Sequence, residues 1–135
     1  MSGGEVLALY GELGTGKTTL VRGVAVGLGV PATSVSSPTF VLIHEYQGRL
    51  LVAHADLYRL AEADLRHVGL GDYLTEKTVL AIEWAERAAG ELPADRLEIR
   101  LSHGQPRSIV FDPTGPRSQA LLARVMKAGR SRRTR

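Results

Sequence analysis

Short apolar runs, separated by turns that contain glycine or proline, recur along the whole of this 135-residue chain. Each run is short enough for a β-strand and too short for most helices. The pattern predicts strands over residues 6–10, 40–46, 50–55, 78–82, 96–101 and 108–111. We therefore expect a sheet built from many short strands.

The polar positions distinguish different kinds of strand. Residues 78–82 are continuously apolar, as expected of a central parallel strand that is covered on both faces. Residues 96–101 alternate strictly, which predicts one face in water, and residues 108–111 are expected to form the neighbouring strand. The strands over residues 40–46 and 50–55 are separated by Gln47, Gly48 and Arg49, and this spacing predicts a hairpin.

Helical spacing of apolar residues appears in two longer segments, residues 19–28 and residues 119–128. Gly29 and Pro31 end the first helix, with glycine past the end and proline beyond it. More helical material is expected across residues 61–68. The side chains expected to face inward are Leu20, Val21, Val24, Ala25 and Leu28 in the first helix and Leu121, Leu122 and Val125 in the last.

These elements predict an α/β fold, with a mainly parallel central sheet, flanking helices and a C-terminal antiparallel portion. No repeat, low-complexity block or linker divides the chain, so we expect residues 1–126 to form a single domain. Residues 127–135 hold five basic side chains and no acid, so the net charge of +3 becomes −2 when they are left out. We expect this basic tail to be disordered, either as a solvated end or as a contact for RNA.

Composition excludes several classes of protein. The chain contains no cysteine, which rules out a disulfide framework, a thiolate zinc site and thiol catalysis. Its apolar stretches are too short to span a membrane, and its first residues lack the pattern of a signal peptide. We therefore expect a cytoplasmic protein.

Residues 11–18 read GELGTGKT, which matches the phosphate-binding P-loop pattern between a predicted strand and a predicted helix. Gly14 and Gly16 let the backbone approach a polyphosphate, because they lack a Cβ and adopt positive φ without steric cost. The following helix directs its unpaired N–H groups and positive dipole end at the phosphates. Lys17 is expected to reach the β- and γ-phosphates, and the Thr18 hydroxyl to ligate Mg²⁺.

A P-loop also needs acidic partners that hold Mg²⁺ and position the attacking group. Asp56 follows one predicted buried strand and Glu83 follows another. Ligand-binding residues of open parallel sheets lie at such strand ends, at the edge where the P-loop also lies. Both carboxylates are therefore candidate site residues.

Five motifs occur in an order that resembles the TsaE (formerly YjeE) family of P-loop ATPases, over residues 5–111. They are GELGTGKTT with a following Arg22-Gly23, then SPTF at residues 37–40, HADLYRL at residues 54–60, GL with DY at residues 69–73, and IEWAE at residues 82–86. A P-loop alone fits many families, but the ordered set is specific.

The resemblance implies roles for individual residues. Thr18 and Glu83 correspond to the family's Mg²⁺ ligands, Asp56 to a Walker B-like position, and Thr39 to a segment similar to switch I, which senses the γ-phosphate. Trp84 resembles a functionally important tryptophan, with core packing as the alternative, and His54 matches the family, with strand-end packing as an equal alternative. The implied nucleotide contacts are Gly11, Gly14, Thr15, Gly16, Lys17, Thr18, Thr19 and Thr39.

The resemblance also implies an activity. Members of this family bind ATP with Mg²⁺ and are required for threonylcarbamoyladenosine modification of tRNA, acting with a TsaB–TsaD complex. They commonly carry a strand and helix ahead of the P-loop strand that shape the adenine pocket, whereas ten residues precede Gly11 here. We therefore expect the base to be held otherwise, with the segment around Arg107 as the candidate, unless further residues precede this sequence.

Three other functions fit a P-loop. A GTPase is disfavoured because guanine readers use an Asn-Lys-x-Asp motif and this chain has no asparagine. The D-x-x-G match at residues 112–115 comes late and predicts a proline turn instead. A small-molecule kinase would need a lid and an acceptor pocket, for which residues 65–76 offer the only room. A nucleotide-responsive binding module, whose output is an interaction, also remains open.

Overall fold

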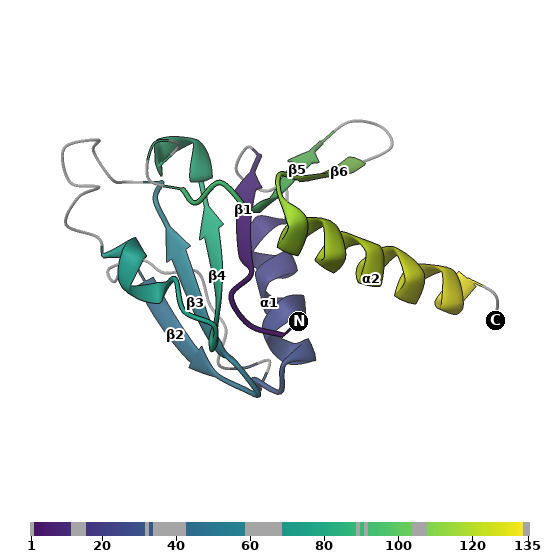
Figure 1. Ribbon diagram of the computed structural model, residues 1–135, viewed down its shortest axis with the longest axis horizontal. Helices are drawn as coiled ribbons and strands as arrows, with labels where there is room; N and C mark the ends of the chain where they lie inside the picture. The colour runs from purple at the N-terminus through teal and green to yellow at the C-terminus, as the bar shows by residue number, and fades with distance from the viewer. Residues whose placement is uncertain are drawn as a thin grey trace.

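The computed structural model describes residues 2–11, 16–31, 33, 43–58, 69–88, 90, 92–103 and 108–133, with the backbone alone from residue 128. Six strands form one sheet in the order β2-β3-β4-β1-β5-β6 (Figure 1). The strands are β1 (Val6–Tyr10), β2 (Ile43–Gln47), β3 (Leu51–Asp56), β4 (Thr78–Glu83), β5 (Leu97–Ser102) and β6 (Ser108–Pro113). The helices are α1 (Lys17–Gly27) and α2 (Pro116–Arg133), with 3-10 turns η3 (Leu70–Tyr73) and η4 (Ala85–Ala88).

The centre of the sheet is parallel and both edges are antiparallel, as predicted. Strand β1 pairs in parallel with β4 and β5, and β3 pairs in parallel with β4. The hairpin β2–β3 adds one antiparallel edge and β5–β6 adds the other. Every residue of β4 is buried, which confirms the prediction for a continuously apolar strand. Residues 40–42 and the predicted helix over residues 61–68 lie outside the described part of the chain.

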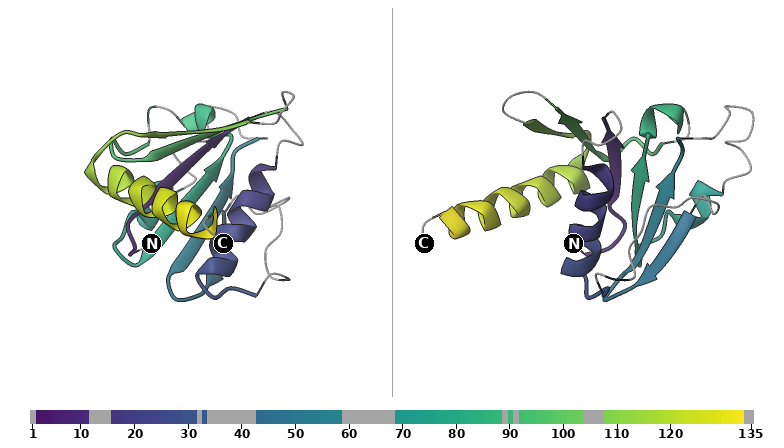
Figure 2. Two further views of the ribbon diagram at one scale, coloured as in Figure 1. Left: turned by 90° about the vertical axis from the view of Figure 1, so that its right-hand side faces the viewer. Right: turned by 180° about the vertical axis from the view of Figure 1, so that it is seen from behind.

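Two apolar layers enclose the sheet. Helices α1 and α2 contribute to one layer, in which Val21, Ala25 and Leu121 pack with side chains of the strands. The turns η3 and η4 contribute Leu70 and Ala85 to the opposite layer. Figure 2 shows α1 running along the sheet, whereas α2 leads away from it toward its C-terminal end. No helix among the described residues combines the length and the apolar character that crossing a bilayer requires.

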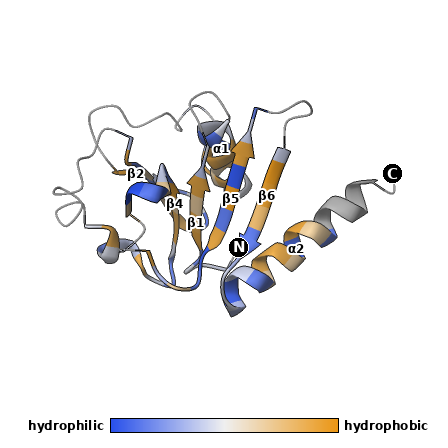
Figure 3. Ribbon diagram, turned by 90° about the horizontal axis from the view of Figure 1, so that it is seen from above, coloured by the Kyte–Doolittle hydropathy of each residue, from blue (hydrophilic) through white to orange (hydrophobic). Residues whose placement is uncertain are grey.

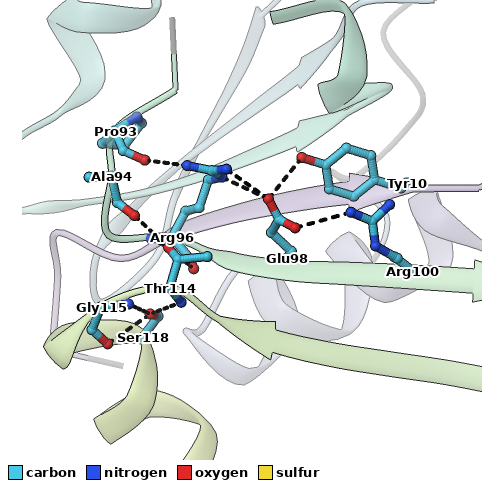
Figure 4. A network of polar contacts seen from close by, with 9 residues as sticks. All are labelled: Tyr10, Pro93, Ala94, Arg96, Glu98, Arg100, Thr114, Gly115 and Ser118. Carbon is cyan, nitrogen blue, oxygen red and sulfur yellow. Dashed lines mark hydrogen bonds and ion pairs between the residues drawn. The ribbon is translucent and has the colours of Figure 1, made fainter. Parts of the chain in front are cut away.

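Strand β5 differs from its predicted alternation at Glu98, whose side chain was expected in water. Glu98 is only 8% exposed, because Arg96 and Arg100 pair with its two carboxylate oxygens at 2.8 and 3.1 Å. The Tyr10 hydroxyl donates a third contact at 3.4 Å (Figure 4). Basic neighbours therefore cover a carboxylate that polarity alone would place outside. Figure 3 shows the hydrophilic interruptions along β5 between the apolar positions.

Helix α2 begins before and ends beyond the predicted segment, and its backbone remains helical through Arg133. Leu121 is buried and Leu122 is partly buried against the core, as predicted. Val125 is 42% exposed, so its predicted inward position is wrong. The reason is the direction of the helix, which has left the sheet by this turn (Figure 1).

The side chains of Ser118 and Asp95 hold the backbone at the start of α2. The Ser118 hydroxyl accepts hydrogen bonds from the backbone N–H groups of Thr114 and Gly115, both at 3.0 Å (Figure 4). The Asp95 carboxylate accepts from the N–H groups of Arg117 and Ser118 at 2.8 and 3.0 Å. Asp112 and Pro113 end strand β6, and the chain then turns through Thr114 and Gly115 into α2, so the predicted turn begins only after the proline.

Candidate nucleotide-binding site

The carboxyl ends of β1, β3 and β4 lie side by side at one edge of the sheet. Glu83 at the end of β4 is in register with Leu9 of β1 and with Asp56 at the end of β3. Strand β1 then leads through Gly11 toward the start of α1. The structure therefore brings the two predicted carboxylates and the described part of the predicted P-loop to the same edge, where parallel sheets bind their ligands.

Helix α1 begins at a position that only glycine adopts readily. Gly16 is the N-cap residue, with φ of 100° and ψ of 19°. Among the described residues, a Cβ there would meet the Leu101 side chain alone, at an ordinary contact distance of 3.9 Å, so the positive φ is the reason for glycine that these residues show. The N-cap Gly16 has no side chain that could cap this end, and the first turn contains no acidic residue. The positive end of the helix dipole is therefore not neutralised by the helix's own first turn.

Thr18 and Glu83 are in direct contact. The Thr18 hydroxyl lies 3.1 Å from Oε1 and 3.0 Å from Oε2 of the Glu83 carboxylate. Glu83 is 4% exposed, so its carboxylate is held almost out of water. A side chain from the start of α1 and a side chain from a strand end thus meet, which is the arrangement that two ligands of one metal ion would need.

Lys17 lies beside this pair. Its side chain is 5% exposed, and its ammonium group donates a hydrogen bond to the backbone carbonyl of Gly11. The ammonium nitrogen also lies 4.1 Å from the centre of the Trp84 ring, a distance that gives a cation–π attraction. Burial lowers the pKa of Lys17, and the nearby Glu83 carboxylate opposes that shift.

Trp84 has an unusual backbone. Its φ of 59° makes it the one residue other than glycine with positive φ among the described residues. For a bulky side chain this conformation carries a strain of about 1–3 kcal/mol, which the surrounding contacts must offset. The Trp84 ring packs against Tyr58, with 4.9 Å between ring centres. Trp84 therefore packs against the core and also contacts Lys17, and its functional importance stays a prediction.

Asp56 lies next to Glu83 across the strand pair, and its environment differs from that of Glu83. One oxygen of Asp56 accepts a hydrogen bond from the Tyr58 N–H at 3.0 Å. Burial raises the pKa of Asp56; that hydrogen bond opposes the rise and the negative charge of Glu83 adds to it. The negative charge of Glu83 therefore lies close enough to Asp56 to favour the protonated form of the Asp56 carboxyl.

The donor atoms fit a magnesium ion better than a transition metal. Within the described residues no group of three or more histidine, cysteine or acidic side chains is arranged to hold a metal by itself. Mg²⁺ in phosphate sites needs no such cage, because one or two protein oxygens, phosphate oxygens and water complete its shell. The Thr18 hydroxyl and the Glu83 carboxylate supply oxygen ligands of that kind.

A cavity of about 310 Å³ opens beside the first turn of α1. It lies between that turn and the β5–β6 hairpin, and its lining includes Thr19, a predicted nucleotide contact. The other lining residues are Gly16, Leu20, Leu101, Ser102, Ser108 and Ile109. Space for a group larger than a phosphate is therefore present next to the helix start.

Four predicted site residues are not among the described residues. They are Gly14, Thr15, Thr39 and Arg107. Conversely, the structure brings His54 into the site, where sequence reasoning left it undecided. His54 precedes Asp56 by two residues on the same strand, so the period-two alternation of strands already placed both on one face.

Known proteins match this chain over most of its length. Residues 1–109 match the family model described as "Threonylcarbamoyl adenosine biosynthesis protein TsaE". A Bacillus subtilis protein described as "tRNA threonylcarbamoyladenosine biosynthesis protein TsaE" is 40% identical over 127 residues, covering 92% of this chain and 79% of the relative. A Treponema pallidum protein of the same description is 43% identical over 99 residues, covering 73% of each.

A solved structure has the same fold as this chain. The chain superposes on the crystal structure of Bacillus subtilis YdiB with a TM-score of 0.74 and 33% sequence identity. The match covers 93% of this chain and 78% of the solved one. The fold is thus that of a P-loop protein, with the parallel core and antiparallel edges described above. The sequence match, the fold and the position of the P-loop together show that this chain belongs to the TsaE family.

Proposed function

We propose that this protein binds ATP with Mg²⁺ and hydrolyses it slowly by itself, in the pathway that forms threonylcarbamoyladenosine in tRNA. The family and the descriptions of its relatives support the pathway. The observation that carries the biochemical part is the contact between Thr18 at the start of α1 and Glu83 at the end of β4. Lys17 lies beside that contact.

The backbone N–H groups at the start of α1 and the positive charge of Lys17 would bind the triphosphate. The N–H groups at the start of α1, where Gly16 provides no capping side chain, would donate to phosphate oxygens, and the helix dipole would favour the negative charge of the phosphates. Lys17 would exchange its contact with the Gly11 carbonyl for a phosphate oxygen, since an ammonium group pairs more strongly with an anion. Thr19 and the cavity beside it offer room for the rest of the nucleotide.

The acidic residues Glu83 and Asp56 would act in hydrolysis through the metal ion. Mg²⁺, when bound, supplies positive charge that offsets the charge developing on the phosphates. Thr18 and Glu83 would hold it, and Asp56 would act directly or through a water molecule at the same place. Thr39 would sense the γ-phosphate and Arg107 would contact the base. The role of Thr39 follows from the family resemblance, whereas that of Arg107 follows from the few residues that precede Gly11 in this sequence. Both residues lie outside the described part of the chain.

The proposed partners are a TsaB–TsaD type complex and, through it, tRNA. Stimulation by a protein partner is consistent with a site in which part of the catalytic charge comes from outside the chain. The basic end of α2 is a candidate for contact with tRNA, because residues 116–135 contain no acid and the helix leads away from the sheet (Figure 1). Phosphate contacts of this kind would weaken steeply as salt increases.

The test compares nucleotide binding and hydrolysis in wild type and in Lys17→Ala. Calorimetry with ATP, ADP and GTP in the presence of Mg²⁺ measures affinity and base preference, and phosphate release measures turnover. We expect binding of ATP by wild type and turnover in Lys17→Ala below about one hundredth of wild type, the scale seen when one preorganised charge contact is lost. The matched control is Lys77→Ala, an exposed lysine away from the sheet edge that holds the site. Turnover at the wild-type rate in Lys17→Ala would refute the assignment.

A further inference from the structure

A line of polar side chains runs across strands β2, β3 and β4 and ends on Glu83. Its Tyr46 lies on the face of the sheet that packs against α1. The Tyr46 hydroxyl lies 3.3 Å from Nδ1 of His54, and Nε2 of His54 contacts Oε2 of Glu83. His54 is fully buried, and Tyr46 is buried with it. At the outer end, Nδ1 of His44 lies 3.4 Å from the Tyr46 hydroxyl. Strands β2, β3 and β4 thus contribute in turn to one line of contacts.

The chemistry of the acceptor fixes the direction of these hydrogen bonds. A carboxylate only accepts, so His54 donates from Nε2 to Glu83. In the neutral imidazole the other nitrogen, Nδ1, is then an acceptor, and the Tyr46 hydroxyl donates a hydrogen bond to it. Both ring nitrogens of a fully buried histidine are therefore satisfied, and the ring cannot turn without losing both partners.

This arrangement leaves the Glu83 carboxylate little freedom. His54 donates to Oε2 from the side of β3, while Thr18 donates to the same carboxylate from the side of α1. Burying a polar ring in a sheet interior costs free energy unless it is fully hydrogen-bonded, so an apolar side chain at residue 54 would be a simpler solution for packing alone. Residues that hydrogen-bond to a metal ligand without touching the metal commonly set the orientation and the basicity of that ligand.

We propose that His54, oriented by Tyr46, is a positioning residue that aims the Glu83 carboxylate at the metal bound with ATP. The inference rests on the proposed function, in which Glu83 is a metal ligand. It assigns to His54 a role through Glu83 and no contact with the nucleotide.

The test separates metal-dependent from metal-independent binding of ATP. Calorimetry measures the affinity for ATP with Mg²⁺ and again with EDTA, for wild type, His54→Leu, His54→Gln and Tyr46→Phe. We expect His54→Leu to lose at least about tenfold in affinity with Mg²⁺, in line with the loss of an outer-shell partner, and nothing with EDTA. His54→Gln should recover part of the loss, because its amide can donate to Glu83. Tyr46→Phe should show a smaller loss of the same kind, and it keeps the ring that packs in the core.

Two further variants make the outcome decisive. Tyr73→Phe is the matched control for Tyr46→Phe, since Tyr73 packs against the opposite face of the sheet, and its affinities should equal wild type. Glu83→Gln is the reference for the metal ligand. If Glu83→Gln loses metal-dependent affinity but His54→Leu and Tyr46→Phe do not, the positioning role is wrong and the proposed function stands. If Glu83→Gln also binds ATP with Mg²⁺ as wild type does, both are overturned. Equal losses with Mg²⁺ and EDTA in Tyr46→Phe would mean a purely structural role and would overturn the inference.

Discussion

At the scale of single residues, the contact between Lys17 and Trp84 lets tryptophan fluorescence report on the position of Lys17. The Lys17 ammonium lies over the Trp84 ring, and Trp84 is the only tryptophan in the chain. A cation near an indole ring affects its electronic environment. Any process that moves Lys17 away from the ring should therefore be visible in tryptophan fluorescence.

We predict that ATP with Mg²⁺ changes the fluorescence of Trp84, because Lys17 turns from the ring toward a phosphate. The measurement is a fluorescence titration of wild type against Lys17→Ala, in which the nucleotide-induced change should be largely lost. The Lys77→Ala variant serves as the control and should respond as wild type does. An equally large change in Lys17→Ala would show that the signal arises elsewhere in the molecule.

Glu83 gives a second prediction at this scale. Glu83→Ala should lose hydrolysis more than binding, because a metal ligand matters most as charge develops in the transition state. We expect turnover to fall about 100-fold or more, while ATP affinity falls by a clearly smaller factor. Phosphate release and calorimetry on the same preparation measure the two quantities. Equal losses in both would assign Glu83 a role in folding instead.

At the scale of elements, the attachment of α2 depends on a carboxylate from outside the helix. Asp95 accepts hydrogen bonds from two N–H groups in the first turn of α2, as an N-cap side chain would. Partial burial alone would raise the pKa of Asp95, but hydrogen bonds from Ser118 and Arg117 together lower it. Because the pKa in the folded state lies below the unfolded value, Asp95 stabilises the fold above about pH 4, and this contribution is lost as the pH falls through the folded pKa.

We predict that Asp95→Ala lowers the free energy of unfolding by about 1 kcal/mol at neutral pH, the usual cost of losing a helix cap. The difference in free energy of unfolding between wild type and Asp95→Ala should shrink as the pH falls below about 4, because Asp95 of wild type then becomes protonated and loses its charge. Urea unfolding across pH measures both effects. Asp112→Ala, which removes an exposed carboxylate from β6, is the control. A difference that stays constant down to the lowest pH would contradict the charge-dependent role of Asp95.

The elements also show which sequence patterns were sufficient. All six strands and the hairpin were predictable, since their apolar runs are short and bounded by turns. The burial of Glu98 was not, because it depends on arginines on the same strand and a tyrosine on the next. The exposure of Val125 depends on the direction in which α2 leaves the sheet, and helical spacing contains no information on that direction.

At the scale of the whole molecule, the order of the strands creates the site. Glu83, Asp56 and Lys17 are far apart in the sequence, and they meet because β4 lies between β3 and β1. The strand-end positions predicted that the two carboxylates lie together, and the register of β3 and β4 confirms it. The phosphate chemistry of the motif stays a prediction. The contact of His54 with Glu83 was not predictable, because it needs the lateral register of β3 against β4.

The nucleotide-phosphate contact at the start of α1 is the central claim, and a crystal structure with a non-hydrolysable ATP analogue and Mg²⁺ tests it most directly. We predict phosphate density against the backbone of residues 11–18, with the Lys17 ammonium turned from Trp84 to a phosphate oxygen. Thr18 and Glu83 should lie at the metal. The analogue bound elsewhere on the protein, with Lys17 still on the Gly11 carbonyl, would contradict the claim.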